Sequence, residues 1–440
     1  MSTPAPARTP TGRSAAWERL HPLSPVVRGG RATAALVVFL VIASVQRQQG
    51  DGTHVAIDAV LVGAALVLGL VHWLVTRWSF DGETLRVETG LLRRDARTVP
   101  VARIQAVDLI EPFVAKFLDV AELRIRVAGS GKDERLAYLH RQRATTLRAA
   151  LLATHHGLDA STPEPPELPL AVVSTGRLAS SVALSPSSLL LFVILIALAG
   201  IFVASERAGA AFGAAIAAYL LSLVTVTWRR FNGPYGFTVA SAPDGIRVRR
   251  GLLGTVAETV PARRVQAVRR VEPVLWQPFG WCRLDVDLAG IVPRETSGGP
   301  REMTRTLLPV ADAAVADSVR ASLVDDRGVV STRPPRRALL KSPLSYHNLL
   351  AGHDDRVAVV VTGRLRRETW WVLLEKVQSV RCVQGPVQRR LGLASVHLDV
   401  AGRRAGASFR DRDATEAHGL VDELVEQCRA ARAAAPPASR

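Results

Sequence analysis

The amino-acid sequence predicts a multi-pass membrane protein: four transmembrane helices in two hairpins, and three small α+β modules outside the bilayer. Two observations carry this prediction. Apolar stretches of the length of a membrane span occur in pairs, and one pattern of about 40 positions recurs three times along the chain. The composition, with 48% hydrophobic and 5% aromatic residues and a mean hydropathy of +0.16, is also compatible with a soluble enzyme. The prediction therefore depends on where the apolar residues lie.

The four apolar stretches are Ala32–Val45, Val55–Thr76, Val182–Ala204 and Ala208–Thr227. A bilayer core of about 30 Å requires roughly 20 apolar helical residues, and the last three stretches meet this length. The first has only 14 residues and, taken alone, is equally typical of a buried core helix. Its flanking arginines and the span that follows favour a transmembrane helix. A signal peptide is disfavoured because no small-residue cleavage site follows.

The distribution of arginine predicts the orientation. The net charge is +17, and the chain has four lysines against 52 arginines. The first 31 residues hold five arginines, whereas each short hairpin loop holds one, accompanied by an acidic residue. Further arginines follow the second span of each hairpin, at Arg77, Arg229 and Arg230. The positive-inside rule therefore places both termini and all three modules in the cytoplasm, at the cell membrane.

The internal repeat defines the modules. With Gly90, Gly251 and Gly363 aligned, three segments run without a gap to Gly129, Gly290 and Gly402. Each segment ends in Ala-Gly and has a glutamine at the same offset, at Gln105, Gln266 and Gln378. Each reads as strand, glycine turn, strand, and ends in a strand with one apolar face, which predicts a half-exposed antiparallel strand. Helical stretches follow at about 141–154, 310–324 and 414–431.

A small sheet capped by one C-terminal amphipathic helix is the architecture of a pleckstrin-homology-like split barrel. Two copies contain Val-Pro-x-x-Arg-[Ile/Val]-Gln-x-Val, at Val99–Val107 and Val260–Val268. With the closing Ala-Gly strand and the run Gln384–Val396, these motifs resemble the bacterial pleckstrin-homology-like domain of YdbS/YdbT-type membrane proteins, in the three-domain YdbT-like form. The third copy departs from the motif, because Leu373 replaces the proline. The resemblance implies a partner membrane protein of the same family, with two spans and a single domain.

These features divide the chain into nine expected segments. They are a cytosolic N-terminal segment (1–31), transmembrane hairpin 1 (32–76), module 1 (77–157), a Pro-rich linker (158–181), transmembrane hairpin 2 (182–227), module 2 (228–324), a second linker (325–343), module 3 (344–431) and a disordered tail (432–440).

No catalytic constellation, cofactor site or metal site is predicted. Ser130–Lys132 lacks the glycine and the Ser or Thr of a phosphate-binding loop, so a polar hairpin turn is the better interpretation. The adjacent His155-His156 pair has poor spacing for a metal site. The cysteines Cys282, Cys382 and Cys428 lie far apart, which is typical of a reducing compartment and indicates neither disulfides nor zinc.

Basic clusters beside the shared glycine turn are the remaining functional signal. They provide seven candidate contacts to an anionic surface: Arg93, Arg94, Arg97, Arg249, Arg250, Arg366 and Arg367. Near an anionic leaflet each arginine can contribute about 1 kcal/mol, so lipid headgroups are one expected ligand. A solvated face with orientation signals is the alternative. Nucleic acid is not expected, because aromatic residues do not interleave with these arginines.

The sequence thus favours a non-enzymatic membrane scaffold that presents three modules to proteins or anionic lipid at the inner leaflet, in envelope stress or export. The alternative is a transporter or enzyme subunit that acts through the four membrane helices. That function requires polar groups inside the bundle, and Asp58, His72 and a few hydroxyls are the only candidates. The outward positions of the closing strand differ between modules: Arg124 and Arg126, Asp285 and Asp287, His397 and Asp399. We therefore expect a shared fold with different surfaces.

Overall fold

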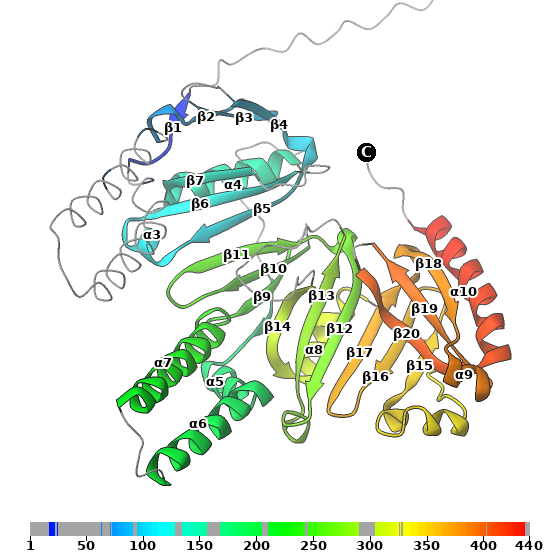
Figure 1. Ribbon diagram of the computed structural model, residues 1–440. Coiled ribbons are helices and arrows are strands. Elements are labelled where there is room, and N and C mark those ends of the chain that lie inside the picture. Colours follow the sequence, from blue (N-terminus) through cyan, green and yellow to red (C-terminus); the bar gives the residue numbers. More distant parts are fainter. Residues whose placement is uncertain are drawn as a thin grey trace, which may run out of the picture. The chain divides into compact units, whose positions relative to one another are not determined.

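The structure is a computed structural model. It describes residues 17–22, 24, 63, 71, 73–90, 95–127, 134–155, 168–204, 210–242, 245–289, 304–324, 326, 329–401 and 403–435. The chain divides into two compact units (Figure 1). The N-terminal unit comprises Met1–Pro166 with Leu253–Thr259, and the C-terminal unit comprises Glu167–Leu252 with Val260–Arg440.

The N-terminal unit holds module 1 as two antiparallel sheets and a helix. The first sheet has the strand order β1-β2-β3-β4, and in the second β7, β6, β5 and β11 follow one another. The apolar alternation predicted for the closing strand is confirmed, since Leu123 and Ile125 are fully buried in the core with Trp78 and Leu85. The elements are β1 (Glu18–Arg19), β2 (Arg77–Phe80), β3 (Thr84–Thr89), β4 (Asp95–Pro100), η1 (Val101–Arg103), β5 (Ile104–Glu111), α3 (Phe113–Phe117), β6 (Val120–Val127), β7 (Glu134–His140), α4 (Arg141–His155) and β11 (Thr255–Val260).

The C-terminal unit holds the rest of module 2 and all of module 3. Its sheets have the strand orders β10-β9-β8, β14-β13-β12-β17-β16-β15 and β18-β19-β20. The elements up to α8 are β8 (Leu168–Val172), α5 (Thr175–Ala183), α6 (Pro186–Ala204), α7 (Ala210–Asn232), β9 (Thr238–Ala242), β10 (Gly245–Arg250), η2 (Ala262–Arg264), β12 (Val265–Pro273), η3 (Gln277–Phe279), β13 (Trp281–Leu288), β14 (Thr304–Asp312) and α8 (Ala313–Ala321).

Module 3 completes this unit and ends in the long helix α10. Its elements are η4 (Arg336–Leu340), η5 (Tyr346–Asn348), β15 (Leu350–His353), β16 (Val357–Thr362), β17 (Arg366–Leu373), η6 (Leu374–Lys376), β18 (Val377–Val383), α9 (Pro386–Arg390), β19 (Leu393–Val400), β20 (Arg403–Asp413) and α10 (Ala414–Ala434). The helices expected after modules 1 and 3 are confirmed. The helix of module 2 begins later than expected, because Val310 is a buried residue of β14.

Two helices of the described part are long and apolar enough to cross a membrane: Pro186–Val203 and Phe212–Asn232, both without burial inside the protein. The first helix begins later than the expected Val182, because Ser185 caps it through the Ser188 amide and Pro186 occupies its first turn. Val182 instead lies in the last turn of the amphipathic α5, which ends at Ala183. The span Ala32–Val45, most of Val55–Thr76, and the residues Asp58 and His72 lie outside the described residues.

The helical hairpin is inserted between two neighbouring strands of module 2. Strand β8 precedes the hairpin and β9 follows it, yet they pair antiparallel, with Val172 opposite Thr238. Module 1 has the same plan, since β1 pairs with β2 across the intervening segment, with Glu18 opposite Trp78. In module 3 the corresponding pair is Thr332 with Ala351. Both expected linkers, 158–181 and 325–343, therefore contain residues that belong to the folded modules.

Candidate interaction sites

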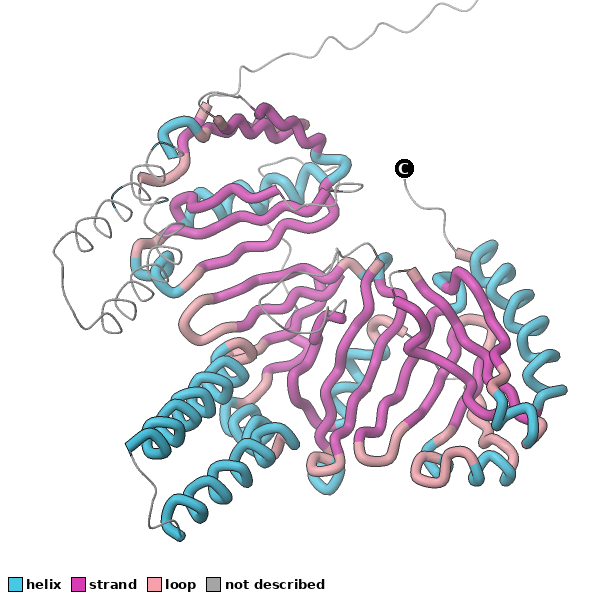
Figure 2. The backbone as a smooth tube through the Cα atoms, viewed as in Figure 1, coloured by secondary structure: helices cyan, strands magenta, loops and turns pink. Residues whose placement is uncertain are grey.

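Neighbouring modules join edge to edge through their strands. In the N-terminal unit, β5 of module 1 pairs with β11 of module 2, and in the C-terminal unit, β12 of module 2 pairs with β17 of module 3. Figure 2 shows the strands from β14 to β15 as one row. The cores are joined as well, because Val359 and Trp371 of module 3 belong to the core cluster of module 2.

The two junctions have the same register. In the first, Glu111 lies opposite Thr255 and Leu109 opposite Ala257. In the second, the equivalent pairs are Glu272 with Arg367 and Arg270 with Thr369. These junctions were not predicted from the sequence. In the structure β12 has no exposed position, as expected for a central strand of a sheet, although its sequence holds four charged or polar residues.

The polar face of the closing strands is largely buried, which corrects the expectation of a half-exposed strand. Arg124, Asp285 and Asp287 are all buried. Asp285 pairs with Arg269 of the neighbouring strand β12 at 2.9 Å, whereas Arg124 pairs at 3.0 Å with Glu122 of its own strand β6. In module 1 the cross-strand ion pair is Asp108 with Arg126.

The same cross-strand positions are used in module 3 with the charges reversed. There Arg381 takes the place of Asp108, Asp399 takes the place of Arg126, and the two side chains lie 2.5 Å apart. The hydrogen bonds from Arg381 and Ser379 hold the pKa of Asp399 below its usual range, and the hydrogen bond to Asp399 raises the pKa of Arg381. The modules therefore differ at these positions in which charged residues pair across the strands. The pair is mostly buried in module 1, whereas Arg381 of the module 3 pair is exposed.

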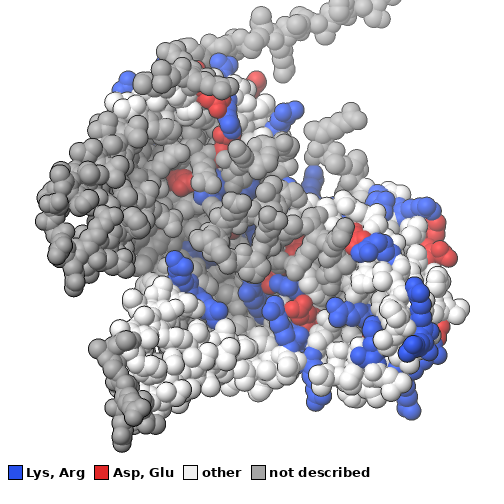
Figure 3. All heavy atoms as spheres, in the orientation of Figure 1, with Lys and Arg blue, Asp and Glu red and all other residues white. Residues whose placement is uncertain are grey.

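The candidate arginines of the glycine turns are distributed among carboxylates. Arg97 lies 2.5 Å from Glu134, and its pKa is raised by that hydrogen bond. Arg366 lies 3.0 Å from Glu368, and Arg367 lies 3.0 Å from Glu272. Figure 3 shows Lys and Arg side chains with Asp and Glu among them, whereas the surface of α6 and of most of α7 is uncharged. Arg229 and Arg230 lie in the last turn of α7. Of the other candidates, Arg249 is exposed and Arg250 half-buried at the end of β10, and Arg93 and Arg94 lie outside the described residues.

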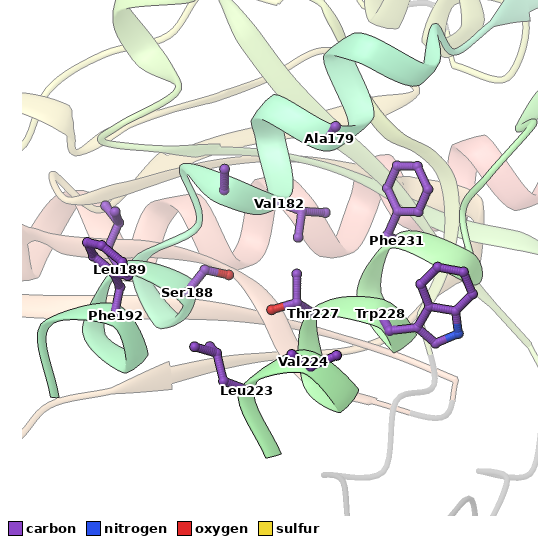
Figure 4. Close-up of a pocket in the computed structure, with 11 residues that line it drawn as sticks. Ala179, Val182, Ser188, Leu189, Phe192, Leu223, Val224, Thr227, Trp228 and Phe231 are labelled. Carbon is purple, nitrogen blue, oxygen red and sulfur yellow. The ribbon is translucent and has the colours of Figure 1, made fainter. Parts of the chain in front are cut away.

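A groove opens between α5 and the two apolar helices (Figure 4). It has a volume of about 610 Å³ and is lined almost entirely by apolar side chains, among them Phe192, Val224 and Trp228. The hydroxyl groups of Ser188 and Thr227 are its polar exceptions. At the adjoining helix ends, Arg230 donates to Ser185 at 3.3 Å and so ties α7 to the beginning of α6. The groove suits an apolar chain and has no catalytic group.

The described residues contain no group of three His, Cys, Asp or Glu side chains that could hold a metal ion. Of the motifs weighed for chemistry, Ser130–Lys132 and His156 lie outside the described residues. All three cysteines are free. Burial raises the pKa of Cys282 to about 12, so its thiol is not activated as a nucleophile.

The fold defines a class of protein: small split-barrel modules, each with two sheets and a C-terminal helix, strung along one chain. The model of the bacterial PH domain family matches three segments, residues 35–155, 188–327 and 332–427, and the chain belongs to this family. The first two segments begin within the predicted hairpins, so each contains most of one predicted hairpin together with the module that follows it. No curated protein matches the sequence.

Proposed function

We propose that this protein is a non-enzymatic integral membrane scaffold of the YdbT-like type. Four helices anchor it in the cell membrane, both termini lie in the cytoplasm, and the PH-like modules form interaction surfaces at the inner leaflet. The observation that carries the proposal is the insertion of the hairpin α6–α7 between the paired strands β8 and β9. A hairpin held at both ends by one sheet fixes the module against the bilayer, whereas a flexible linker would let it move away.

Module 3 supports the same arrangement without a hairpin. Where module 2 has its apolar helices, module 3 has the segment 333–349, between the paired residues Thr332 and Ala351. This segment exposes Leu339, Leu340 and Leu344 next to basic side chains. Exposed leucines beside basic residues are typical of segments that lie in a membrane interface. Module 3 would then contact the bilayer through the segment that is equivalent to the helical hairpin of module 2.

Protein partners fit the module surfaces better than a specific lipid headgroup does. Three of the five described candidate arginines of the glycine turns, Arg97, Arg366 and Arg367, each lie within 3.0 Å of a carboxylate. A paired guanidinium attracts an anionic surface less than a free one, because the net local charge is smaller. The sheets, by contrast, already join other modules of the same kind twice.

The proposal is tested on the full-length protein in its membrane. We expect it to resist extraction at alkaline pH, and we expect Ser205→Cys, at a position between α6 and α7 in the sequence, to react with an impermeant maleimide in intact cells. The native Cys382 is the control, because the proposed topology makes this half-buried thiol reactive only after permeabilisation. Release at alkaline pH, or labelling of the wild type from outside, would contradict the proposed anchoring. Purified protein that turned over a lipid or moved an ion would overturn the non-enzymatic part.

A further inference from the structure

Among the residues that the structure describes, one strand at each end of the series of modules lacks the neighbour that its equivalents have. Strands β5 and β12 each pair on both sides, with the closing strand of their own module and with a strand of the next module. Strand β18 is the equivalent strand of module 3, and it is the last strand of its sheet, paired with β19 alone. Strand β4 is the equivalent of β11 and β17, and it is the last strand of the first sheet.

The side chains of both strands are exposed where their equivalents are buried. In β18, Val383 is 42% exposed, whereas the equivalent Val271 of β12 is 3% exposed. In β4, Thr98 is exposed, whereas the equivalent Thr259 of β11 is 2% exposed. Five of the six residues of β4 are exposed, all but Val99. Such an edge has unpaired backbone N–H and C=O groups and can pair with a strand of another chain.

We propose that β18 of one copy of this protein pairs antiparallel with β4 of a second copy. This contact between two chains would have the same form as the two junctions between modules within one chain. The partner is a second copy because one chain carries both strands that such a junction needs. Strand β18 is the equivalent of β12, and β4 is the equivalent of β17. Such a contact is heterologous, so copies would associate head to tail.

The shared register fixes which residues meet. In the two internal junctions Leu109 lies opposite Ala257, and Arg270 lies opposite Thr369. Cys382 is the module 3 equivalent of Leu109 and Arg270, and Ala96 is the module 1 equivalent of Ala257 and Thr369. The shared register therefore places Cys382 of one copy opposite Ala96 of the next. The same register places Arg381 opposite Arg97. Each of these arginines already has its own carboxylate, Asp399 or Glu134, which offsets the repulsion between them.

The register makes a single substitution a direct test. Directly opposite residues of antiparallel strands have Cα atoms about 4.5 to 5.5 Å apart, a distance that a disulfide spans. Copies of Ala96→Cys that carry two different tags are co-expressed, and membranes are oxidised mildly. We expect disulfide-linked dimers that contain both tags. They should vanish when Cys382→Ser is added.

A register control separates the specific contact from collision. Arg97→Cys is exposed on the same strand, but its side chain points to the other face of the sheet, away from Cys382. We expect little or no dimer from it. The proposal is overturned if Ala96→Cys gives no mixed dimer, or if both variants crosslink equally. It is also overturned if Cys382 is captured by a different protein, since β18 would then belong to that partner. None of these outcomes depends on the proposed membrane topology.

Discussion

Glu272 and Arg367 lie directly opposite each other where β12 of module 2 meets β17 of module 3, with 3.0 Å between carboxylate and guanidinium. Glu272 also lies 2.9 Å from Arg270 of its own strand. At the equivalent position of the other junction, Glu111 accepts a hydrogen bond from Thr255 at 2.7 Å. Both junctions thus use a mostly buried glutamate to bind the incoming strand, although the donor has changed.

The substitution Glu272→Gln should loosen the junction between modules 2 and 3. It removes the charge that two guanidinium groups share, and we expect a loss of about 1 to 2 kcal/mol, because the Arg367 partner is partly solvent-exposed. Hydrogen exchange of the β17 amides should become faster. Glu426→Gln, which removes one partner of an exposed pair on α10, is the matched control and should change exchange little. Equal exchange of β17 in both variants would show that Glu272 does not stabilise the junction.

The exposed leucines of module 3 should contact lipid in the membrane-embedded protein. Leu340 is 76% exposed, and burying a leucine side chain in an apolar phase is favourable by about 1.5 to 3 kcal/mol. A fluorophore on Leu340→Cys, in nanodiscs that contain nitroxide-labelled lipid, should be quenched. The same fluorophore on Arg429→Cys, exposed on α10, is the control and should keep its emission. Similar quenching at both positions would exclude a specific contact of this segment.

The three cysteines should differ sharply in reactivity. Cys282 and Cys428 are buried, and burial raises the pKa of both thiols, whereas Cys382 is half-buried on the edge strand β18. Because the thiolate is the reacting species, native protein at pH 7.5 should take up one maleimide, at Cys382. Mass spectrometry of digests identifies the site, and denatured protein should take up three. Labelling of Cys282 in the native protein would contradict the buried core of module 2.

The sequence predicted the repeated parts of the fold well, because they depend on local patterns. The alternation of Leu123 and Ile125 identified the closing strand, and helical spacing identified α10. The insertion of the hairpin was missed because β8 is short and proline-rich, and its partner β9 lies about 70 residues further on. Pairing between strands so far apart leaves no periodic signal in either one.

The candidate site was harder to predict, because the partners of charged side chains depend on register. Arg124 and Asp285 were expected to be exposed residues of an alternating strand, yet both are buried. Asp285 lies beside Arg269 of the neighbouring strand, and Arg124 lies beside Glu122 of its own strand. The arginines beside the glycine turns were predicted to form cationic patches, but Arg366 and Arg367 form ion pairs with glutamates. The register of the strands decides which charges meet across a sheet, and a single sequence does not determine that register.

His397 should make the stability of module 3 depend on pH. Burial lowers the pKa of this histidine below 6.5, and the nearby Arg381 and Arg410 lower it further, while Asp399 acts in the opposite direction. Above pH 6.5 the side chain is neutral in both the folded and the unfolded chain. As the pH falls below 6.5, the unfolded chain binds the proton first, so the free energy of unfolding decreases until the pH reaches the lowered pKa of the folded state.

We therefore expect module 3 to unfold at lower denaturant concentration at pH 5 than at pH 7.5, and His397→Gln to reduce this difference. Hydrogen exchange of β19 amides against denaturant measures it within the full-length protein. The pKa of Asp399 lies below 3.8, outside this pH range, so that carboxylate does not contribute. His347→Gln, at an exposed position of module 3, is the control and should leave the pH dependence unchanged. If His397→Gln keeps the full pH dependence, the proton that destabilises module 3 binds elsewhere.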